Sequence, residues 1–374
     1  MAMGKRIGIL TSGGDCAGLN AVIRAVTRCA IEIYGWEVHG ICKATYGLMS
    51  RPPESQQLSI RQVDPFLTRG GTFLGTTNKG DPFAFPMADG SVRDRSAEII
   101  EGYHQLGLDA LIGIGGDGSL AILRKLAQQG GINLVGIPKT IDNDVGLTER
   151  SIGFDTAVNI ATEAVDRLHF TAASHSRVMI VEVMGRDAGH IALNAGIAGG
   201  ADVILIPEVP YSLKNICAHL KQRQLDGCDY SIVVVSEAVC TEAGALLEKG
   251  HFADCRLGGV GQYLAEQITT ISGAETRVTV LGHTQRGGTS SPLDRILASA
   301  FGVAAVELIA NEQYDRMVTW QERAVKSVPI AAAIKDYRTV EPTGTLVKTA
   351  RGLGICLGDR LTARHTHELL PAVT

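Results

Sequence analysis

Two aspartates separated by one residue, Asp142 and Asp144, directly follow an apolar stretch at residues 133–137. The stretch has the length and composition of a buried parallel strand, so we expect both carboxylates at its carboxyl end. Open α/β sheets bind ligands in the crevice at that end of their strands. The two aspartates are therefore candidates for a catalytic or metal site rather than simple caps of polar turns.

A second polar loop follows an apolar strand pattern at residues 109–114. It consists of Gly115-Gly116-Asp117-Gly118-Ser119 and leads into a helical pattern at residues 120–128. Glycine lets the backbone approach an anion, and the first amides of a helix point toward it, so this order predicts a phosphate site. Asp117 would repel a bare pyrophosphate but would bind Mg²⁺ on a phosphate, which favours phosphoryl transfer.

The same glycines match the dinucleotide fingerprint G-x-G-x-x-G from Gly113 to Gly118. In that fingerprint an acidic residue at the end of the next strand holds the ribose. The next strand ends near Pro138 without such a residue, so binding of a nicotinamide nucleotide is disfavoured. The Walker pattern is absent from the sequence, which excludes the P-loop nucleoside triphosphatases.

A third glycine loop occurs near the amino terminus. Residues 6–11 predict a short strand, the loop at 12–18 contains Gly13 and Gly14, and residues 20–34 predict an amphipathic helix. Three phosphate-type loops on one sheet exceed what tight turns alone require. They indicate a site for a phosphorylated ligand.

Apolar runs and helical periods alternate along most of the remaining chain. We expect helices at 156–170, 189–198, 213–224, 260–272 and 292–310, and strands at 178–183, 202–206, 230–236 and 276–281. This alternation implies parallel strands with helices on both faces of each sheet. The irregular stretch at 47–94 is expected to be a mobile arm over the active-site face of the first domain.

The composition agrees with an α/β enzyme. The 374 residues suggest two domains or one large one, and 44 glycines with 5% aromatic residues suit many strand-to-helix turns. A net charge of −4 gives no electrostatic reason to expect nucleic acid or an anionic membrane. No apolar run is long enough to span a membrane and no signal peptide is recognisable, so we expect a cytoplasmic protein. The eight cysteines form no C-x-x-C pair and are expected to be reduced packing thiols.

Six motifs, in this order along the chain, resemble those of the 6-phosphofructokinase family. They are L-T-S-G-G-D at 10–15, G-G-T-F-L-G-T at 70–76, I-G-G-D-G-S at 114–119, P-K-T-I-D-N-D at 138–144, M-G-R at 184–186 and L-G-H-T-Q-R-G-G at 281–288. NAD, diacylglycerol and sphingosine kinases share a similar G-G-D-G loop but lack the M-G-R and H-x-Q-R-G-G elements. The combination is therefore far more specific than any one motif.

The resemblance implies a fold of two similar three-layer αβα domains, with mainly parallel sheets, that face each other across a cleft. Chain crossovers near Gly153, Arg286 and Tyr337 are expected. They would give a nucleotide and Mg²⁺ domain at 1–153 plus 286–337 and a sugar-phosphate domain at 154–285 plus 338–374. The resemblance further implies a homotetramer in which a neighbour's arginines complete each sugar-phosphate site.

The activity implied by the resemblance is transfer of the γ-phosphoryl group of ATP to the 1-hydroxyl of fructose 6-phosphate, the committed step of glycolysis. Asp142 would be the general base, and Thr140 would orient the groups at the same centre. Arg186 would meet the negative charge on the phosphoryl oxygens in the transition state. Asp117 and Asp144 would hold Mg²⁺, directly or through water.

Two sets of binding residues also follow from the resemblance. The sugar-phosphate set is Thr140, Asp142, Arg177, Met184, Gly185, Arg186, Glu237, Arg277, His283 and Arg286. The donor set is Gly13, Gly14, Gly116, Asp117, Gly118 and Ser119. Bacterial ATP-dependent members carry an arginine shortly after G-G-T-F-L-G, where this chain has Asn78 and Lys79, which we expect to take its place.

The phosphoryl donor is the main ambiguity. Pyrophosphate-dependent members have aspartate at the position of Gly118 and share Lys139, whereas ATP-dependent bacterial members typically have glycine at both positions. We expect ATP, because an aspartate at 118 would fill and charge the space that the α-phosphate needs. Pyrophosphate-dependent transfer remains the alternative. A catalytically silent, sugar-phosphate-sensing subunit is disfavoured because Asp142, Arg186 and Asp117 are all present.

The effector pocket of the bacterial enzymes is rich in basic residues, and only part of that set occurs here. Asp226, Cys228 and His169 replace several of its members, whereas Arg24, Arg28 and Asp202 remain. We therefore expect a weak response to ADP and phosphoenolpyruvate, because each lost contact is a charge-assisted hydrogen bond.

Overall fold

The computed structural model describes residues 4–249 and 256–360, and the chain divides into two compact units. The first unit comprises Met1–Thr156 and Arg286–Arg338, and the second comprises Ala157–Gln285 and Thr339–Thr374. Each unit is discontinuous because the chain passes from one to the other after residues 156, 285 and 338. No helix in the described ranges is long and apolar enough to span a membrane.

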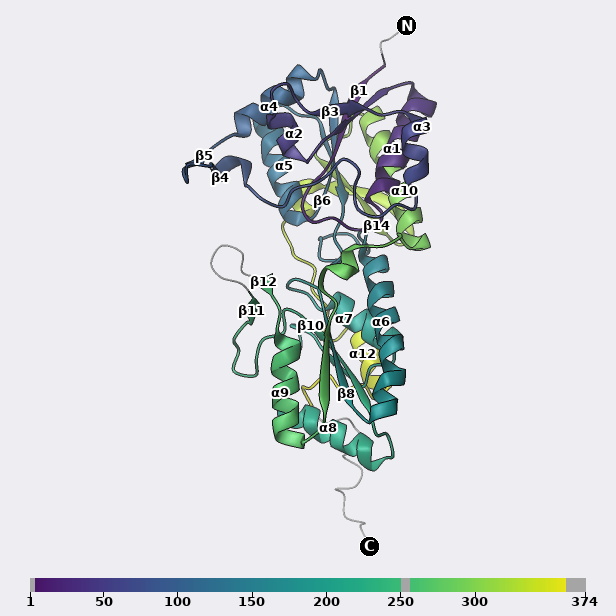
Figure 1. The fold of residues 1–374 in the computed structure, drawn as a ribbon. Coiled ribbons are helices and arrows are strands. Elements are labelled where there is room, and N and C mark those ends of the chain that lie inside the picture. The colour runs from purple at the N-terminus through teal and green to yellow at the C-terminus, as the bar shows by residue number, and fades with distance from the viewer. Residues whose placement is uncertain (1–3, 250–255, 361–374) are drawn as a thin grey trace. The chain divides into compact units, whose positions relative to one another are not determined.

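A seven-stranded sheet forms the centre of the first unit (Figure 1). Its strands, in order across the sheet, are β15 (Ala324–Pro329), β14 (Arg316–Gln321), β7 (Leu134–Pro138), β6 (Ala110–Gly115), β1 (Arg6–Thr11), β2 (Glu37–Ile41) and β3 (Ser55–Gln57). The five inner strands are parallel, and the two edge strands, β3 and β15, are antiparallel to their neighbours. The carboxyl ends of β1, β6 and β7 therefore lie side by side.

Helices cover both faces of this sheet, because every residue of β6 and β7 is buried and each face needs an apolar partner. Helices α1 (Leu19–Tyr34) and α10 (Pro292–Ala310) pack together on one face, and α4 (Ser96–Gln105) and α5 (Asp117–Gly130) cover the other (Figure 1). The shorter helices are α2 (Thr45–Met49), α3 (Ile60–Val63) and α11 (Ile330–Ala333), and β4 (Phe85–Pro86) pairs with β5 (Val92–Arg93). The stretch predicted to be an irregular arm thus contains several short elements.

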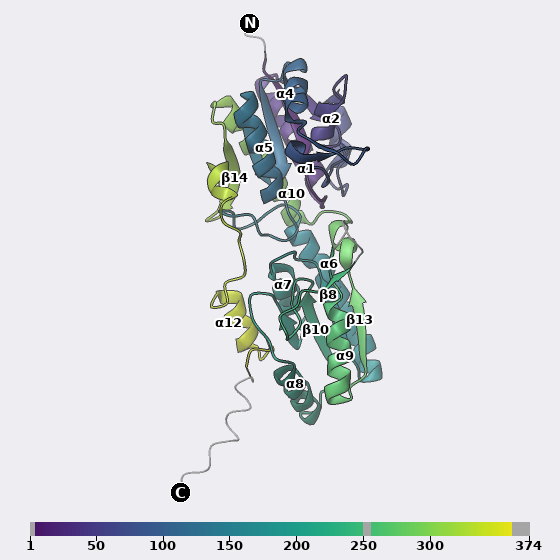
Figure 2. The same cartoon turned by 90° about the vertical axis from the view of Figure 1, so that its left-hand side faces the viewer.

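The second unit contains a four-stranded, fully parallel sheet. Its order is β13 (Thr276–Val280), β8 (Val178–Val183), β10 (Ser231–Ser236) and β9 (Val203–Leu205). Val178, Ile180, Val233 and Val235 pack in one cluster with α8 (Leu213–Leu225) and α9 (Val260–Ser272). Helix α7 (His190–Ala198) packs on β9, β10 and α12 (Thr345–Gly352), and Figure 1 shows α12 and α6 (Phe154–His175) on the opposite side of the sheet from α9. Figure 2 shows the same sheet from the side of α9. Strand β11 (Glu248–Lys249) pairs with β12 (Arg256–Leu257) in a separate two-stranded antiparallel sheet.

The predicted α/β class with mainly parallel sheets is confirmed. Several predicted elements have the expected bounds, including β1, β8, α9 and α10. Strands β2, β14 and β15 were not predicted, because each is short or half-exposed and lacks a continuous apolar run.

Candidate active site

Three of the motif loops meet at the carboxyl edge of the first unit's sheet. The N–H of Ser12 donates to the carbonyl oxygen of Ile114 at 2.9 Å, and the N–H of Lys139 donates to that of Gly115 at 2.9 Å. The register of β1, β6 and β7 therefore brings together the loops that sequence reasoning had assigned separately to phosphate binding and catalysis.

Helix α5 begins at Asp117, one turn earlier than its apolar period indicates, because Gly116 precedes it in an extended conformation and accepts the first helical bond from Leu120 at 2.9 Å. The amides of residues 117–119 consequently have no acceptor within the helix. A Cβ atom added at Gly118 would meet no described atom within 4 Å. The helix start therefore offers amide donors and open space to a phosphate.

Gly13 lets the first loop approach this helix start. Its φ of 83° lies in the left-handed region, and an added Cβ atom would lie 3.0 Å from Ser119 Oγ and 3.4 Å from Lys139 Nζ. The N–H of Gly13 donates to the carbonyl oxygen of Thr77 at 2.9 Å. This contact places the exposed residues Asn78 and Lys79 in the segment next to the loop.

Lys139 links two of the loops from a buried position. Its side chain donates from Nζ to the carbonyl oxygen of Gly14 at 2.5 Å, and the residue is 4% exposed. Burial lowers the pKa of the Lys139 ammonium, and the Arg286 guanidinium, which donates to the carbonyl oxygen of Asp15 at 3.1 Å, lowers it further. The adjacent Cys16 thiol is fully buried, and burial raises its pKa to about 12.

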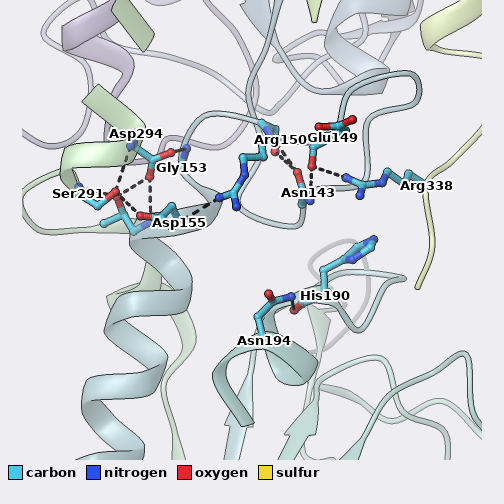
Figure 3. Close-up of polar contacts among 12 residues, drawn as sticks. Asn143, Glu149, Arg150, Gly153, Asp155, His190, Asn194, Ser291, Asp294 and Arg338 are labelled. Atoms are coloured by element: carbon cyan, nitrogen blue, oxygen red, sulfur yellow. Dashed lines mark hydrogen bonds and ion pairs between the residues drawn. The ribbon is translucent and has the colours of Figure 1, made fainter. Parts of the chain in front are cut away.

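The proposed base and its neighbour form a compact polar turn. Thr140 donates from Oγ1 to Asp142 Oδ2 at 3.2 Å, and the N–H of Asp142 donates back to Thr140 Oγ1 at 3.1 Å. Asn143, with φ of 55°, follows and accepts from the N–H of Ser151 at 3.0 Å. Figure 3 shows that Asn143 also donates to the carbonyl oxygen of Glu149, at 3.2 Å. Asp142 thus lies between Thr140, which bonds to its carboxylate, and Asn143, which is fixed by Glu149 and Ser151.

Two contacts that hold this region were not found by sequence reasoning. Tyr337 donates from its hydroxyl to Asp144 Oδ2 at 2.5 Å. Asp294, which is 1% exposed, accepts from the N–H of Gly153 at 3.0 Å (Figure 3) and from the N–H of Thr156 at 2.9 Å. Burial raises the pKa of Asp294. The sequence predicted the helix at 292–310 that contains Asp294, but only the fold shows that Asp294 accepts from amides at the start of α6.

In the second unit, β8 and β10 bring the M-G-R turn beside Glu237. The N–H of Glu237 donates to the carbonyl oxygen of Val183 at 2.9 Å, and Glu237 Oε1 accepts from the N–H of Arg186 at 3.3 Å. A Cβ atom at Gly185 would lie 2.4 Å from the carbonyl oxygen of Ala188, so the turn requires glycine there. Met184 precedes it, and His283 is exposed in the short helix after β13.

Arg177 and Arg277 lie at the opposite end of that sheet. Arg177 immediately precedes β8, Arg277 is the second residue of β13, and both form ion pairs with Glu275, at 2.9 and 2.5 Å. A strand of this length separates its two ends by roughly 20 Å. The second unit therefore does not bring these arginines together with Arg186 and Glu237.

The two arginines that remain of the expected effector set already have an anionic partner. Arg24 Nε lies 3.2 Å from Asp64 Oδ1, and Arg28 Nη1 lies 2.8 Å from the same oxygen. The Arg28 guanidinium holds the pKa of the Asp64 carboxyl below its usual range. Arg28 also pairs with Glu32 at 2.6 Å.

The effector residues of the second unit are likewise used within it or are exposed. Asp202 pairs with Arg223 at 2.8 Å and accepts from the N–H of Ile232 at 2.8 Å. A ring nitrogen of His169 lies 2.7 Å from the carbonyl oxygen of Gly199. Asp226 and Cys228 are exposed.

Comparisons with known proteins agree on one family. The sequence profile of the family described as Phosphofructokinase matches residues 6–309. A protein named ATP-dependent 6-phosphofructokinase 1 from a Nostoc species is 71% identical over 360 residues, which are 96% of this chain and 100% of that protein. Its namesake from a Synechocystis species is 68% identical over 356 residues, or 95% and 99% of the two chains.

Solved structures show the same fold. Phosphofructokinase from Pichia pastoris has a TM-score of 0.77 and 30% identity, and the match covers 89% of this chain and 36% of that longer one. A pyrophosphate-dependent phosphofructokinase from Nitrosospira multiformis has a TM-score of 0.79 at 22% identity, with 95% and 89% of the two chains covered. The second likeness establishes the fold only.

Proposed function

Because the chain belongs to the phosphofructokinase family, we propose that it transfers the γ-phosphoryl group of ATP to the 1-hydroxyl of fructose 6-phosphate. The observation that carries the proposal is the meeting of three loops at the ends of β1, β6 and β7. These loops combine amide donors at the start of α5, a buried cation and a carboxylate already engaged with a hydroxyl.

The donor phosphates would bind at the loop of Gly13 and Gly14 and at the first turn of α5, which comprises Gly116, Asp117, Gly118 and Ser119. Amides there favour an anion, and the open space at Gly118 leaves room for the phosphates of a nucleotide. Asn78 and Lys79 are exposed in the adjoining segment and would contact the outer phosphates. This space favours ATP over pyrophosphate as the donor.

Asp117 and Asp144 are the residues that would hold Mg²⁺. Their carboxylate oxygens are the hard ligands this ion prefers, and Mg²⁺ usually takes only one or two carboxylates together with substrate phosphates and water. The hydroxyl of Tyr337 orients the Asp144 carboxylate by a 2.5 Å hydrogen bond. When bound, the ion would neutralise charge on the phosphates and favour their alignment.

Asp142 would accept the proton of the sugar 1-hydroxyl as that oxygen attacks. The Thr140 hydroxyl, which donates to one oxygen of Asp142, keeps the carboxylate oriented for this transfer. Arg186 would stabilise negative charge on the transferred group. Met184, Gly185, Glu237, His283 and Arg286 would bind the sugar phosphate.

We further propose a cytoplasmic homotetramer whose sugar-phosphate sites are shared between subunits. The support is the position of Arg177 and Arg277, which lie at the amino end of their sheet while Arg186 and Glu237 lie at its carboxyl end. Cations placed at that distance can bind the sugar 6-phosphate of a neighbouring subunit's site. Arg177 and Arg277 also share Glu275, so they would act as a pair.

A coupled assay tests the proposed reaction. Formation of fructose 1,6-bisphosphate is linked to NADH oxidation, with ATP and pyrophosphate supplied separately and Mg²⁺ varied. We expect activity with ATP that requires Mg²⁺ and little or none with pyrophosphate. Activity with pyrophosphate alone would overturn the choice of donor, and inactivity with both would support the silent regulatory subunit.

A further inference from the structure

Carboxylates hold both ends of the turn that carries Arg186. At its start, the N–H of Arg186 donates to Glu237 Oε1 at 3.3 Å. At its end, the N–H of Gly189 donates to the Glu208 carboxylate, 3.0 Å from Oε1 and 3.1 Å from Oε2. Glu237 belongs to the M-G-R neighbourhood expected from the family resemblance, whereas no motif includes Glu208.

Glu208 acts as a cap for a helix that cannot cap itself. Gly189 is the N-cap residue of α7 and has no side chain to accept from the first amides. A Cβ atom at this position would lie 2.3 Å from Ile206 Cβ and 2.8 Å from Glu208 Oε2, so the close approach depends on glycine. A carboxylate beside the amino end of a helix is also stabilised by the helix dipole.

The turn between the two carboxylates is conformationally strained. Arg186 has φ of 51°, a left-handed value that is unfavourable for a residue with a side chain. Such conformations persist only where surrounding contacts maintain them. The N–H of Ala188, which donates to the carbonyl oxygen of Gly185 at 3.0 Å, closes the turn but does not attach it to the rest of the unit. Glu237 and Glu208 attach it through its backbone N–H groups, and the Ser236 hydroxyl also donates to the carbonyl oxygen of Ala188, at 3.5 Å.

Glu208 also binds the segment that returns from the first unit. Its Oε1 accepts from the N–H of Val340 at 2.8 Å, two residues after Arg338, where the first unit ends. Val340 is 5% exposed, so this contact is anchored in packed structure. One carboxylate oxygen therefore fixes the end of the Arg186 turn to a buried part of the second unit.

We propose that Glu208 is a positioning residue for Arg186. It holds residues 186–189 in the conformation that presents the Arg186 guanidinium to the transferred phosphoryl group. The inference rests on the proposed function, because it presumes that Arg186 acts in the transition state. Among the described residues, the Glu208 carboxylate accepts hydrogen bonds only from backbone amides, so its effect on catalysis passes through the geometry of the turn.

Kinetics of Glu208→Ala and Glu208→Gln give the first test. The alanine variant should lower kcat by about 10- to 100-fold, the loss expected when a reacting group is misplaced by about an ångström, with little change in the KM for ATP. Glutamine should restore most of the rate, because Oε1 alone accepts from both amides. The matched control is Glu242→Ala. In wild type the Glu242 carboxylate also accepts from a helix-start amide, the N–H of Leu213 in α8, and its loss should leave kcat unchanged. An unchanged kcat in Glu208→Ala would overturn the proposal.

A double-mutant cycle separates positioning from a general structural role. In an Arg186→Ala background, adding Glu208→Ala should have little further effect on kcat, because the group that Glu208 positions is already gone. Multiplicative losses in the double variant would overturn the role of Glu208 while leaving that of Arg186 intact. An unchanged kcat in Arg186→Ala alone would instead overturn the proposed role of Arg186. If Glu208→Ala fails to fold, Glu208→Asp carries the same test, since its shorter side chain keeps the charge.

Discussion

The Lys139 ammonium donates from Nζ to the carbonyl oxygen of Gly14 at 2.5 Å, which ties the loop after β7 to the loop after β1. A cation that is 4% exposed thus joins the two loops proposed to bind the donor and the sugar. Burial lowers the pKa of Lys139 from its ordinary value of 10.5. Burial raises the pKa of the neighbouring Cys16 thiol to about 12, so this thiol stays neutral between the lowered pKa of Lys139 and pH 10.5.

This burial predicts a specific dependence of stability on pH. Between the lowered pKa of the folded state and 10.5, the unfolded chain binds more protons at Lys139 than the folded chain does. The free energy of unfolding contributed by this group therefore rises with pH across that interval. Lys139→Met should remove this rise, so the stability of wild type relative to the variant should increase toward pH 10.5. Denaturant unfolding at several pH values measures it, with Lys348→Met as the exposed control, and parallel curves for wild type and Lys139→Met would contradict the lowered pKa of Lys139.

Asp142→Asn should lower kcat by about 10²-fold or more, because the amide cannot accept the proton of the attacking hydroxyl. The affinity for fructose 6-phosphate should change little, since the amide preserves the size of the side chain and an oxygen to accept from Thr140. Steady-state kinetics with direct binding of the sugar phosphate measure both quantities. A variant with near wild-type kcat would place the base elsewhere.

Gly118→Asp should sharply reduce the use of ATP. Two like charges about 4 Å apart repel by about 4 kcal/mol at an effective dielectric of 20, and bound Mg²⁺ would offset part of this. The substituted Cβ atom meets no described atom within 4 Å, so the fold should tolerate the change. Gly118→Ala is the matched control, which adds the carbon without the charge and should retain more activity. The measurement is kcat/KM for ATP and for pyrophosphate in wild type and both variants. An unchanged kcat/KM for ATP in Gly118→Asp would exclude Gly118 as the donor determinant.

Arg277→Ala should raise the KM for fructose 6-phosphate with a smaller effect on the KM for ATP. If Arg277 serves a neighbour's site, inactive Asp142→Asn subunits mixed with Arg277→Ala subunits should regain activity at low sugar-phosphate concentration. In such hybrids, one class of site combines an intact Asp142 from one subunit with an intact Arg277 from the other. Activity no higher than the sum of the separate variants, in hybrids shown to exchange subunits, would mean that Arg277 acts within its own chain.

Asp64→Asn should strengthen the binding of phosphorylated effectors. In the folded protein Asp64 lies within 3.2 Å of Arg24 and within 2.8 Å of Arg28, and its charge compensates both guanidinium groups. Removing that charge leaves the arginines available for the charge-assisted hydrogen bonds that a phosphate accepts. Calorimetric titration with ADP should show tighter binding than in wild type, whereas Glu32→Gln, which affects Arg28 alone, should have a smaller effect. Strong activation of wild type by ADP through these arginines would refute the weakened pocket.

Local sequence determined the inner framework of both sheets. The strands at β1 and β8 and the helices α9 and α10 have their predicted bounds, because buried parallel strands are continuous apolar runs and glycine or proline marks their ends. The loops at Gly13, Gly118 and Asp142 were predicted to lie at carboxyl ends for the same local reason. Edge strands such as β15 were missed, since half-exposed residues give a weak pattern and pairing depends on a distant partner.

The tertiary structure alone decided which of these residues lie close together. The predicted parallel strands already placed Arg177 and Arg277 at the amino ends and Arg186 after a carboxyl end, but motif spacing could not show that β13 lies beside β8, because that depends on strand order. Nor could it find Glu208 or Tyr337, whose partners are 19 and 193 residues away in the sequence. Local conformation follows from neighbouring residues, whereas the orientation of a site follows from long-range hydrogen bonds that exist only once the sheets have formed.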